Sequence, residues 1–142
     1  MDFPFRTPDA KTVNPGQFCI PTGPTIGTNV TKSATANTYG SYLEMIASTS
    51  AALYITGATV FGDALNTKYL QFMLGTGAGG AETAVYIFRV GNGTTITPLV
   101  FDPPIPVATA TRIAAKVAGD GTIADVSQLV LLCINQSDVV AM

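Results

Sequence analysis

Residues 68–74 read Lys-Tyr-Leu-Gln-Phe-Met-Leu, and no other stretch of the chain indicates its fold class so clearly. Every second residue is strongly apolar, so that Leu70, Phe72 and Leu74 fall on one side of an extended chain and the residues between them on the other. A period of two residues is the spacing of a β-strand with one buried face. We therefore predict a strand that covers a core.

A similar pattern appears in residues 109–117, Thr-Ala-Thr-Arg-Ile-Ala-Ala-Lys-Val, where Ile113 and Val117 share one face and Arg112 and Lys116 the other. From about residue 38 onward, short apolar runs alternate with Gly, Asn, Pro and Asp, which is typical of an all-β sandwich. The predicted strands are Ser41–Ala47, Ala52–Phe61, Lys68–Leu74, Thr83–Val90, Thr95–Phe101, Pro106–Val117 and Ser127–Asn135.

Residues 41–55 admit a second interpretation, because their apolar positions also satisfy helical spacing. The run Ser48-Thr49-Ser50 favours a turn, since short hydroxyl side chains compete for backbone hydrogen bonds. We therefore predict two strands joined by a turn. Further turns are predicted at Gly75–Gly80, Gly91–Gly93, Asp102–Pro104 and Gly119–Gly121.

Residues 1–36 differ from the rest of the chain because they contain five of its nine prolines. Proline lacks the N–H group that helices and central strands need, so we predict an extended Pro/Gly-rich N-terminal arm over 1–36 and a β-sandwich domain over 37–142. The arm either contacts a neighbouring subunit or folds back on its own domain. Its candidate contact residues are Phe3, Phe5, Phe18, Ile20 and Ile26.

Charged residues make up 11% of the chain, about half the usual share. Such a surface suits permanent contact with other protein, although a low-charge or secreted monomer is the alternative. The seven cations are scattered, which argues against a nucleic-acid binder. We expect no membrane span and no secretory signal, because the chain lacks a run of about 18 apolar residues and a charged leader before an apolar core.

The residues that carry most enzyme chemistry are missing. There is no His, and two distant cysteines, Cys19 and Cys133, do not make a zinc site. We expect both to be free thiols, no catalytic, cofactor or metal site, and no enzymatic activity. The letters of Gly75–Gly80 fit G-x-G-x-x-G, but a strand follows where a dinucleotide site needs a helix. Glu44 is the acid to watch, as the partner of Arg112 or Arg89 in a structural ion pair.

Two stretches resemble motifs of small virion proteins from tailed phages. Residues 40–50, Gly-Ser-Tyr-Leu-Glu-Met-Ile-Ala-Ser-Thr-Ser, are similar to a signature with Trp at the place of Tyr42. Residues 109–116, Thr-Ala-Thr-Arg-Ile-Ala-Ala-Lys, are similar to a second one with Gly at the place of Ala110. The resemblance covers about residues 38–135 and implies a jelly-roll-like antiparallel β-sandwich. The chain departs from it in the segment Asp102–Pro106.

Proteins of that group decorate capsids, cement capsomers or sit in tails and fibres. The resemblance implies this class of virion proteins without choosing among its members. The low-charge surface and the arm with its spaced apolar residues lead us to expect a capsid decoration or cement protein, which binds the major capsid protein or another virion protein and is assembled in the host cytoplasm. We expect a homotrimer, because closed symmetric oligomers are usual. The alternative is a tail, spike or fibre module that binds host glycans through rings of its five tyrosines: Tyr39, Tyr42, Tyr54, Tyr69 and Tyr86.

Overall fold

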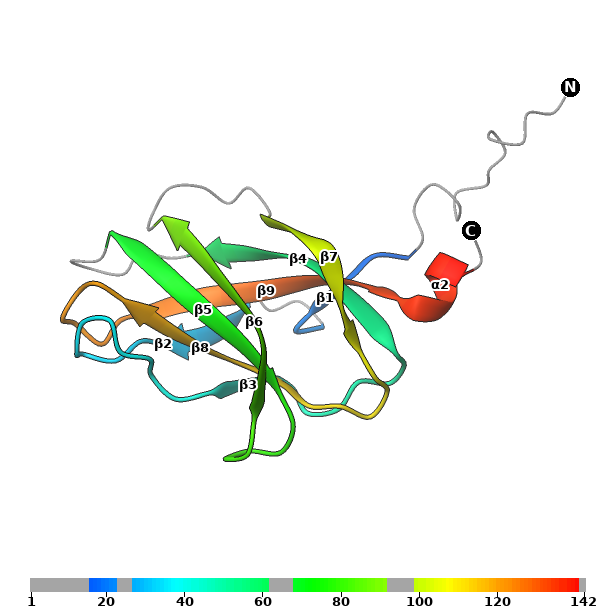
Figure 1. Ribbon diagram of the computed structural model, residues 1–142, viewed down its shortest axis with the longest axis horizontal. Coiled ribbons are helices and arrows are strands. Elements are labelled where there is room, and N and C mark those ends of the chain that lie inside the picture. The colour runs from blue at the N-terminus through cyan, green and yellow to red at the C-terminus, as the bar shows by residue number, and fades with distance from the viewer. Residues whose placement is uncertain (1–15, 23–26, 62–67, 92–98, 141–142) are drawn as a thin grey trace, which may run out of the picture.

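Two antiparallel β-sheets packed face to face make up the protein in the computed structural model, which describes residues 16–22, 27–61, 68–91 and 99–140 (Figure 1). The five-stranded sheet contains β1 (Phe18–Ile20), β2 (Thr28–Thr31), β4 (Leu53–Phe61), β7 (Leu99–Val107) and β9 (Val126–Asn135). The four-stranded sheet contains β3 (Leu43–Ile46), β5 (Tyr69–Thr76), β6 (Thr83–Gly91) and β8 (Ile113–Gly119). A short helix, α2 (Gln136–Val140), follows β9. The all-β sandwich predicted from the sequence is confirmed.

The order of the strands is that of a jelly roll. Strand β2 pairs with β9, β3 with β8, β4 with β7 and β5 with β6, so that four nested antiparallel pairs are rolled into two sheets. The four-stranded sheet runs β3-β8-β5-β6, and β9 joins β4 to both β1 and β2 in the other sheet. This is the double-sheet arrangement of eight strands, with β1 added to it.

The core lies between the sheets and follows the alternation seen in the sequence. Leu70, Phe72 and Leu74 of β5 are buried, as the two-residue period predicts. The ring of Phe88 on β6 stacks on Phe72 at 5.2 Å and meets Phe101 of β7 at the same distance. Because Phe101 belongs to the other sheet, these rings fasten the two sheets together.

Residues 41–55 form two strands, as predicted, rather than a helix: β3 ends at Ile46 and β4 begins at Leu53. The two strands do not pair with each other, because they belong to opposite sheets. The segment between them therefore crosses from one layer of the sandwich to the other.

The turn predicted at Asp102–Pro104 is wrong, since β7 runs through it from Leu99 to Val107. Strand β7 is the edge of its sheet, where some N–H groups have no ladder partner and proline is tolerated. The following strand consequently begins at Ile113 and not at Pro106. The turns predicted at Gly75–Gly80 and Gly119–Gly121 are confirmed in part: loops follow Thr76 and Gly119, while Gly75, Thr76 and Gly119 still belong to β5 and β8. Of the turn predicted at Gly91–Gly93, residues 92–93 lie outside the described residues.

The boundary that the sequence placed after residue 36 is wrong for the described part of the N-terminal segment. Strands β1 and β2 both lie within residues 1–36, and both pair with β9. Ile20 and Val30 have no exposed surface and belong to the core. The segment therefore supplies part of the sandwich, which is the folded-back alternative. Residues 1–15 and 23–26 lie outside the described residues.

Lys32, directly after β2, is buried with 1% of its surface exposed. Its ammonium group donates hydrogen bonds to the carbonyl oxygens of Gly121, at 2.9 Å, and Ser33, at 3.1 Å. Lys32, one of the seven cations scattered along the sequence, is therefore a buried residue that links the end of β2 to the loop after β8.

Candidate functional site on the outer face of the four-stranded sheet

Polar and aromatic side chains gather on the outer face of the four-stranded sheet. Alternation along β5 sends Tyr69, Gln71 and Met73 outward while their neighbours enter the core. The pairing register places Met73 between Lys116 of β8 and Ile87 of β6. This face is the one part of the described surface where several tyrosines and cations lie within contact distance of one another.

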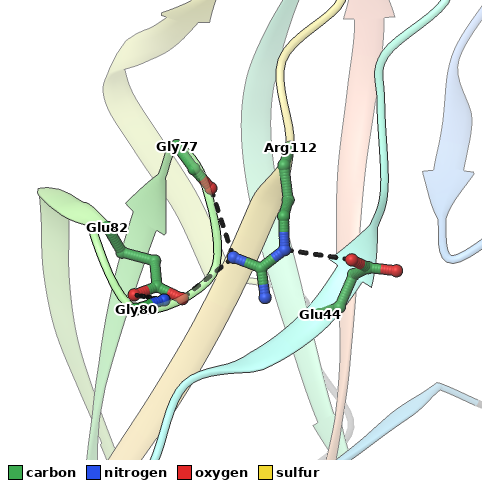
Figure 2. A network of polar contacts seen from close by, with 5 residues as sticks. All are labelled: Glu44, Gly77, Gly80, Glu82 and Arg112. Carbon is green, nitrogen blue, oxygen red and sulfur yellow. Dashed lines mark hydrogen bonds and ion pairs between the residues drawn. The ribbon is translucent and has the colours of Figure 1, made fainter.

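Arg112 stands just before β8 and is held by three acceptors (Figure 2). Its Nε donates to Glu44 Oε2 at 3.0 Å, and its Nη1 donates to Glu82 Oε1 at 2.9 Å and to the carbonyl oxygen of Gly77 at 3.2 Å. The second oxygen of Glu82 accepts a hydrogen bond from the backbone N–H of Gly80 at 3.0 Å. The guanidinium group thereby links β3 and β8 to the glycine loop between β5 and β6.

The pair of Glu44 with Arg112 that the sequence indicated is present in this network, but Glu44 is not the buried acid. Its side chain is 49% exposed, whereas that of Glu82 is 8% exposed. The acid that matters most for the loop is thus Glu82, which sequence reasoning did not select. The one signal in the sequence for this role is the position of Glu82, two residues after the glycine-rich run Gly75–Gly80.

The electrostatics of the network follow from its hydrogen bonds. The pKa of Glu82 lies below its ordinary value, first because its own backbone N–H donates to the carboxylate, and further because Arg112 and Gly80 donate to it. The pKa of Arg112 is raised by its hydrogen bonds to Glu44 and Glu82. Glu82 and Arg112 therefore stay charged near neutral pH, which suits a structural ion pair better than the transfer of a proton.

A shallow slot opens on the same face, at the other end of β5. Ala118 and Gly119 of β8 contribute small residues to its lining, and Tyr39 and Tyr69 contribute aromatic rings. The remaining lining residues are polar: Asn37, Gln71 and Arg89.

The side chains of this slot are fixed by one another. Gln71 Nε2 donates to the hydroxyl oxygen of Tyr39 at 2.7 Å, and Arg89 Nη2 donates to Gln71 Oε1 at 2.8 Å. The Tyr69 hydroxyl donates to Asn37 Oδ1 at 3.3 Å. The guanidinium carbon of Arg89 lies 4.6 Å from the centre of the Tyr69 ring. Such a network holds the side chains around the slot in one arrangement.

Lys116 lies beside the slot with its ammonium nitrogen 5.1 Å from the centre of the Tyr39 ring and 4.5 Å from that of Tyr42. The Tyr42 ring occupies the space that a side chain at Gly75 would need, since a Cβ there would come within 2.8 Å of it. The absence of a side chain at Gly75 thus allows the Tyr42 ring to lie against β5. The fifth ring of the sequence-based proposal, Tyr86, packs against the core instead.

The predicted subunit-contact residues have different positions. Ile20 is fully buried inside its own chain, so its assignment as a contact residue is wrong, because it sits at an inward position of β1. Phe18 of the same strand packs against the core. Phe3, Phe5 and Ile26 lie outside the described residues.

Both cysteines are free thiols, although their strands are neighbours. Cys19 of β1 is exposed, whereas Cys133 of β9 is buried, and burial raises its pKa to about 12. Asp120 acts as a turn acid: it accepts hydrogen bonds from the backbone N–H groups of Lys68, at 2.8 Å, and Tyr69, at 3.4 Å. These two bonds, that from Lys68 first, lower its pKa.

Among the described residues, no three His, Cys, Asp or Glu side chains come together as a metal site would require. Within the same ranges, no helix is long and apolar enough to cross a membrane. Comparison with protein-family models, with curated proteins and with solved structures found no match to this chain.

Proposed function

We propose that this chain is a structural protein of virus particles, of the capsid decoration type, which binds the outer head lattice and stabilises it. Its work is adhesion: a jelly roll with an exposed sheet edge that another protein subunit covers. The major capsid protein or another virion protein is the partner, and the assembled particle is the place of action.

The strand order is compatible with this proposal but does not distinguish it from other functions of the same fold. Double-sheet jelly rolls occur in viral capsid domains and in lectin domains. Because one fold serves many functions, the argument must rest on particular surfaces of this chain.

The observation that carries the proposal is the open edge of β6. Natural sheets protect their edges with short strands, charges or proline. Strand β3 has four residues, and β7 contains three prolines in its second half. Strand β6 has nine residues and no proline, and no described strand pairs with its outer side. Val85 and Ile87 on this strand are 39% and 51% exposed.

Such an edge needs a cover. A long, apolar, unpaired strand is a template for pairing with other chains, and a surface with 11% charged residues offers little repulsion against it. In a chain that is permanently part of a protein lattice, a neighbouring subunit covers this edge. Because many copies bind one particle, contacts that are weak one by one become strong together.

The location of the protein in purified particles of the virus that encodes it tests the proposal. We expect mass spectrometry to find the copy number of a head-lattice component and image reconstruction to place one jelly roll at each repeating position of the shell. A copy number and position confined to the tail would replace decoration with a tail or fibre role. Absence from particles would end both versions.

A charge placed on β6 tests whether this edge must be covered, by a neighbouring copy of the chain or by another virion protein, for attachment to occur. We expect Ile87→Lys to abolish attachment to particles that lack the wild-type protein, because a lysine cannot be buried without a partner. Val100→Lys is the matched control, since Val100 is exposed on β7, the proline-containing edge of the other sheet. Retained attachment of Ile87→Lys together with loss in Val100→Lys would move the contact to β7.

A further inference from the structure

The slot on the outer face of the four-stranded sheet has a composition that the adhesive role does not use. Its lining combines the rings of Tyr39 and Tyr69 with the amide groups of Asn37 and Gln71 and the guanidinium group of Arg89. Tyr and Arg are also common at protein interfaces, but their convergence with two amide groups around a hollow is typical of a site for a small ligand.

The small residues explain why a hollow exists here. Ala118 and Gly119 end β8 beside β5, where larger side chains would fill the space above the sheet. The neighbouring Tyr39 is held aside by its hydrogen bond with Gln71, and Tyr69 by its hydrogen bond with Asn37. The slot is thus kept open by contacts that are already made.

The charge of the slot is unbalanced. Of the five N–H groups of Arg89, one donates to Gln71, and no carboxylate pairs with this guanidinium in the described part of the chain. Lys116 nearby faces tyrosine rings and likewise has no carboxylate partner among the described residues. Arg89 therefore keeps the capacity to bind one carboxylate through two parallel hydrogen bonds.

We propose that this slot binds an acidic saccharide. The carboxylate of the sugar pairs with Arg89. The hydroxyl groups of the sugar exchange hydrogen bonds with Asn37 and Gln71, and the C–H groups of its ring pack against Tyr39 and Tyr69. A nucleic acid is disfavoured as the occupant because the chain has a net charge of −2, and Arg89 and Lys116 are too few cations to displace many counterions from a phosphate backbone.

A pair of ligands that differ in one group tests this inference on the isolated, full-length protein. Methyl β-glucuronide and methyl β-glucoside share the ring and differ at C6, where the first carries a carboxylate. We expect the glucuronide, titrated to tens of millimolar, to shift the amide NMR signals of Gln71, Ala118 and Gly119 in a saturable way. The glucoside should bind about tenfold more weakly, since it cannot form the charge-assisted pair.

Two variants test whether Arg89 is the residue that binds the carboxylate of the sugar. Arg89→Gln removes the cation, and Gln71→Glu supplies a carboxylate that occupies it, so both should reduce glucuronide binding to the level of the glucoside. Lys68→Gln is the control, because it removes an exposed cation near the start of β5 that does not line the slot. Since Gln71→Glu keeps Arg89 in place, its loss of binding cannot be attributed to a missing arginine contact within the fold.

Three outcomes would overturn the proposal: no saturable shift with either glycoside, equal binding of both, or acetate or an acidic peptide binding as well as the glucuronide. The last result would mean that the slot recognises a carboxylate alone and that its natural occupant is a protein side chain. None of these outcomes bears on attachment to particles, because the titration uses the free protein. A failed decoration experiment would equally leave the slot untouched.

Discussion

Lys32 shows most sharply how one residue can differ from the expectation that its type creates. Lysine is among the residues least often fully buried, yet this one has 1% of its surface exposed. Its ammonium group donates to two backbone carbonyl oxygens, and its carbon chain is buried with it. Burial of the charge costs free energy, which the two hydrogen bonds and the packing offset.

Substitution of Lys32 separates packing from charge. We expect Lys32→Ala to lower the free energy of unfolding by about 2–4 kcal/mol, because it leaves a cavity and two unsatisfied carbonyl groups. Lys32→Met keeps most of the side-chain volume and should lose about half as much. Urea unfolding followed by circular dichroism measures both, with the exposed Lys68→Ala as the control, expected within about 0.5 kcal/mol of the wild type. A Lys32→Met protein more stable than the wild type would show that the ammonium group is a net cost.

Glu82 and Asp120 make the protein sensitive to acid. The pKa values of both carboxylates lie below the ordinary values, which are 4.5 for Glu82 and 3.8 for Asp120. Each ionised carboxylate therefore stabilises the fold at a pH above its ordinary pKa, and this stabilisation is lost as the pH falls through its lowered pKa. We expect the urea midpoint to stay constant near neutral pH and to fall below about pH 4.5. The variant Glu82→Gln should have a lower midpoint at neutral pH and a shallower decline in acid.

The control for this measurement is Asp102→Asn, which removes an exposed carboxylate on β7 that makes no hydrogen bond within the described ranges. Its profile should follow that of the wild type. If Glu82→Gln also follows the wild type across the whole range, then the negative charge of Glu82 contributes nothing measurable to the stability of the fold.

Among the elements, β1 and β2 make the N-terminal segment part of the folded sandwich. Both strands add to the same side of β9, β1 along Leu131–Cys133 and β2 along Val126–Leu129. Their inward residues, Ile20 and Val30, are fully buried. Without these two strands one side of β9 would lose its backbone partners and part of the core would face water.

Truncation at two positions tests this dependence. Removal of residues 1–36 should leave a chain that shows no cooperative thermal transition, because β1, β2 and Lys32 are lost together. Removal of residues 1–15 ends before the first described strand, so we expect its transition to stay within a few degrees of the wild type. Circular dichroism on heating distinguishes the two. A cooperative transition in the shorter protein that lacks residues 1–36 would contradict the role given to β1 and β2.

The elements also show which information the sequence contained. The two-residue period placed Leu70 and Phe72 inside and Gln71 outside, because that pattern depends only on neighbours along one strand. The prolines of β7 misled, since tolerance of proline depends on whether a strand lies at an edge, which no local pattern states. The burial of Lys32 depends on Gly121, far along the chain. The slot likewise requires Tyr39 to meet Gln71 across the register of separate elements.

At the scale of the whole molecule, the two sheets differ in how their edges end. The five-stranded sheet ends in the prolines of β7 on one side and in the short strands β1 and β2 on the other. The four-stranded sheet ends in the short β3 and in the long, apolar β6. Among the edges that the structure describes, that of β6 therefore has the fewest features that protect a strand from pairing with another chain.

Self-association in solution should follow from this asymmetry. The chain has a mass of 14.7 kDa, and we expect light scattering after size exclusion to give about three times this value, since closed rings satisfy every copy of a contact that joins unlike surfaces. Ile87→Lys should reduce the mass to that of one chain, because burial of an unpaired ammonium group costs more than one apolar contact returns. Val100→Lys should keep the larger mass. A wild-type protein that stays at 14.7 kDa at every concentration would show that β6 is covered by a different protein or by none, and the trimer would have to be abandoned.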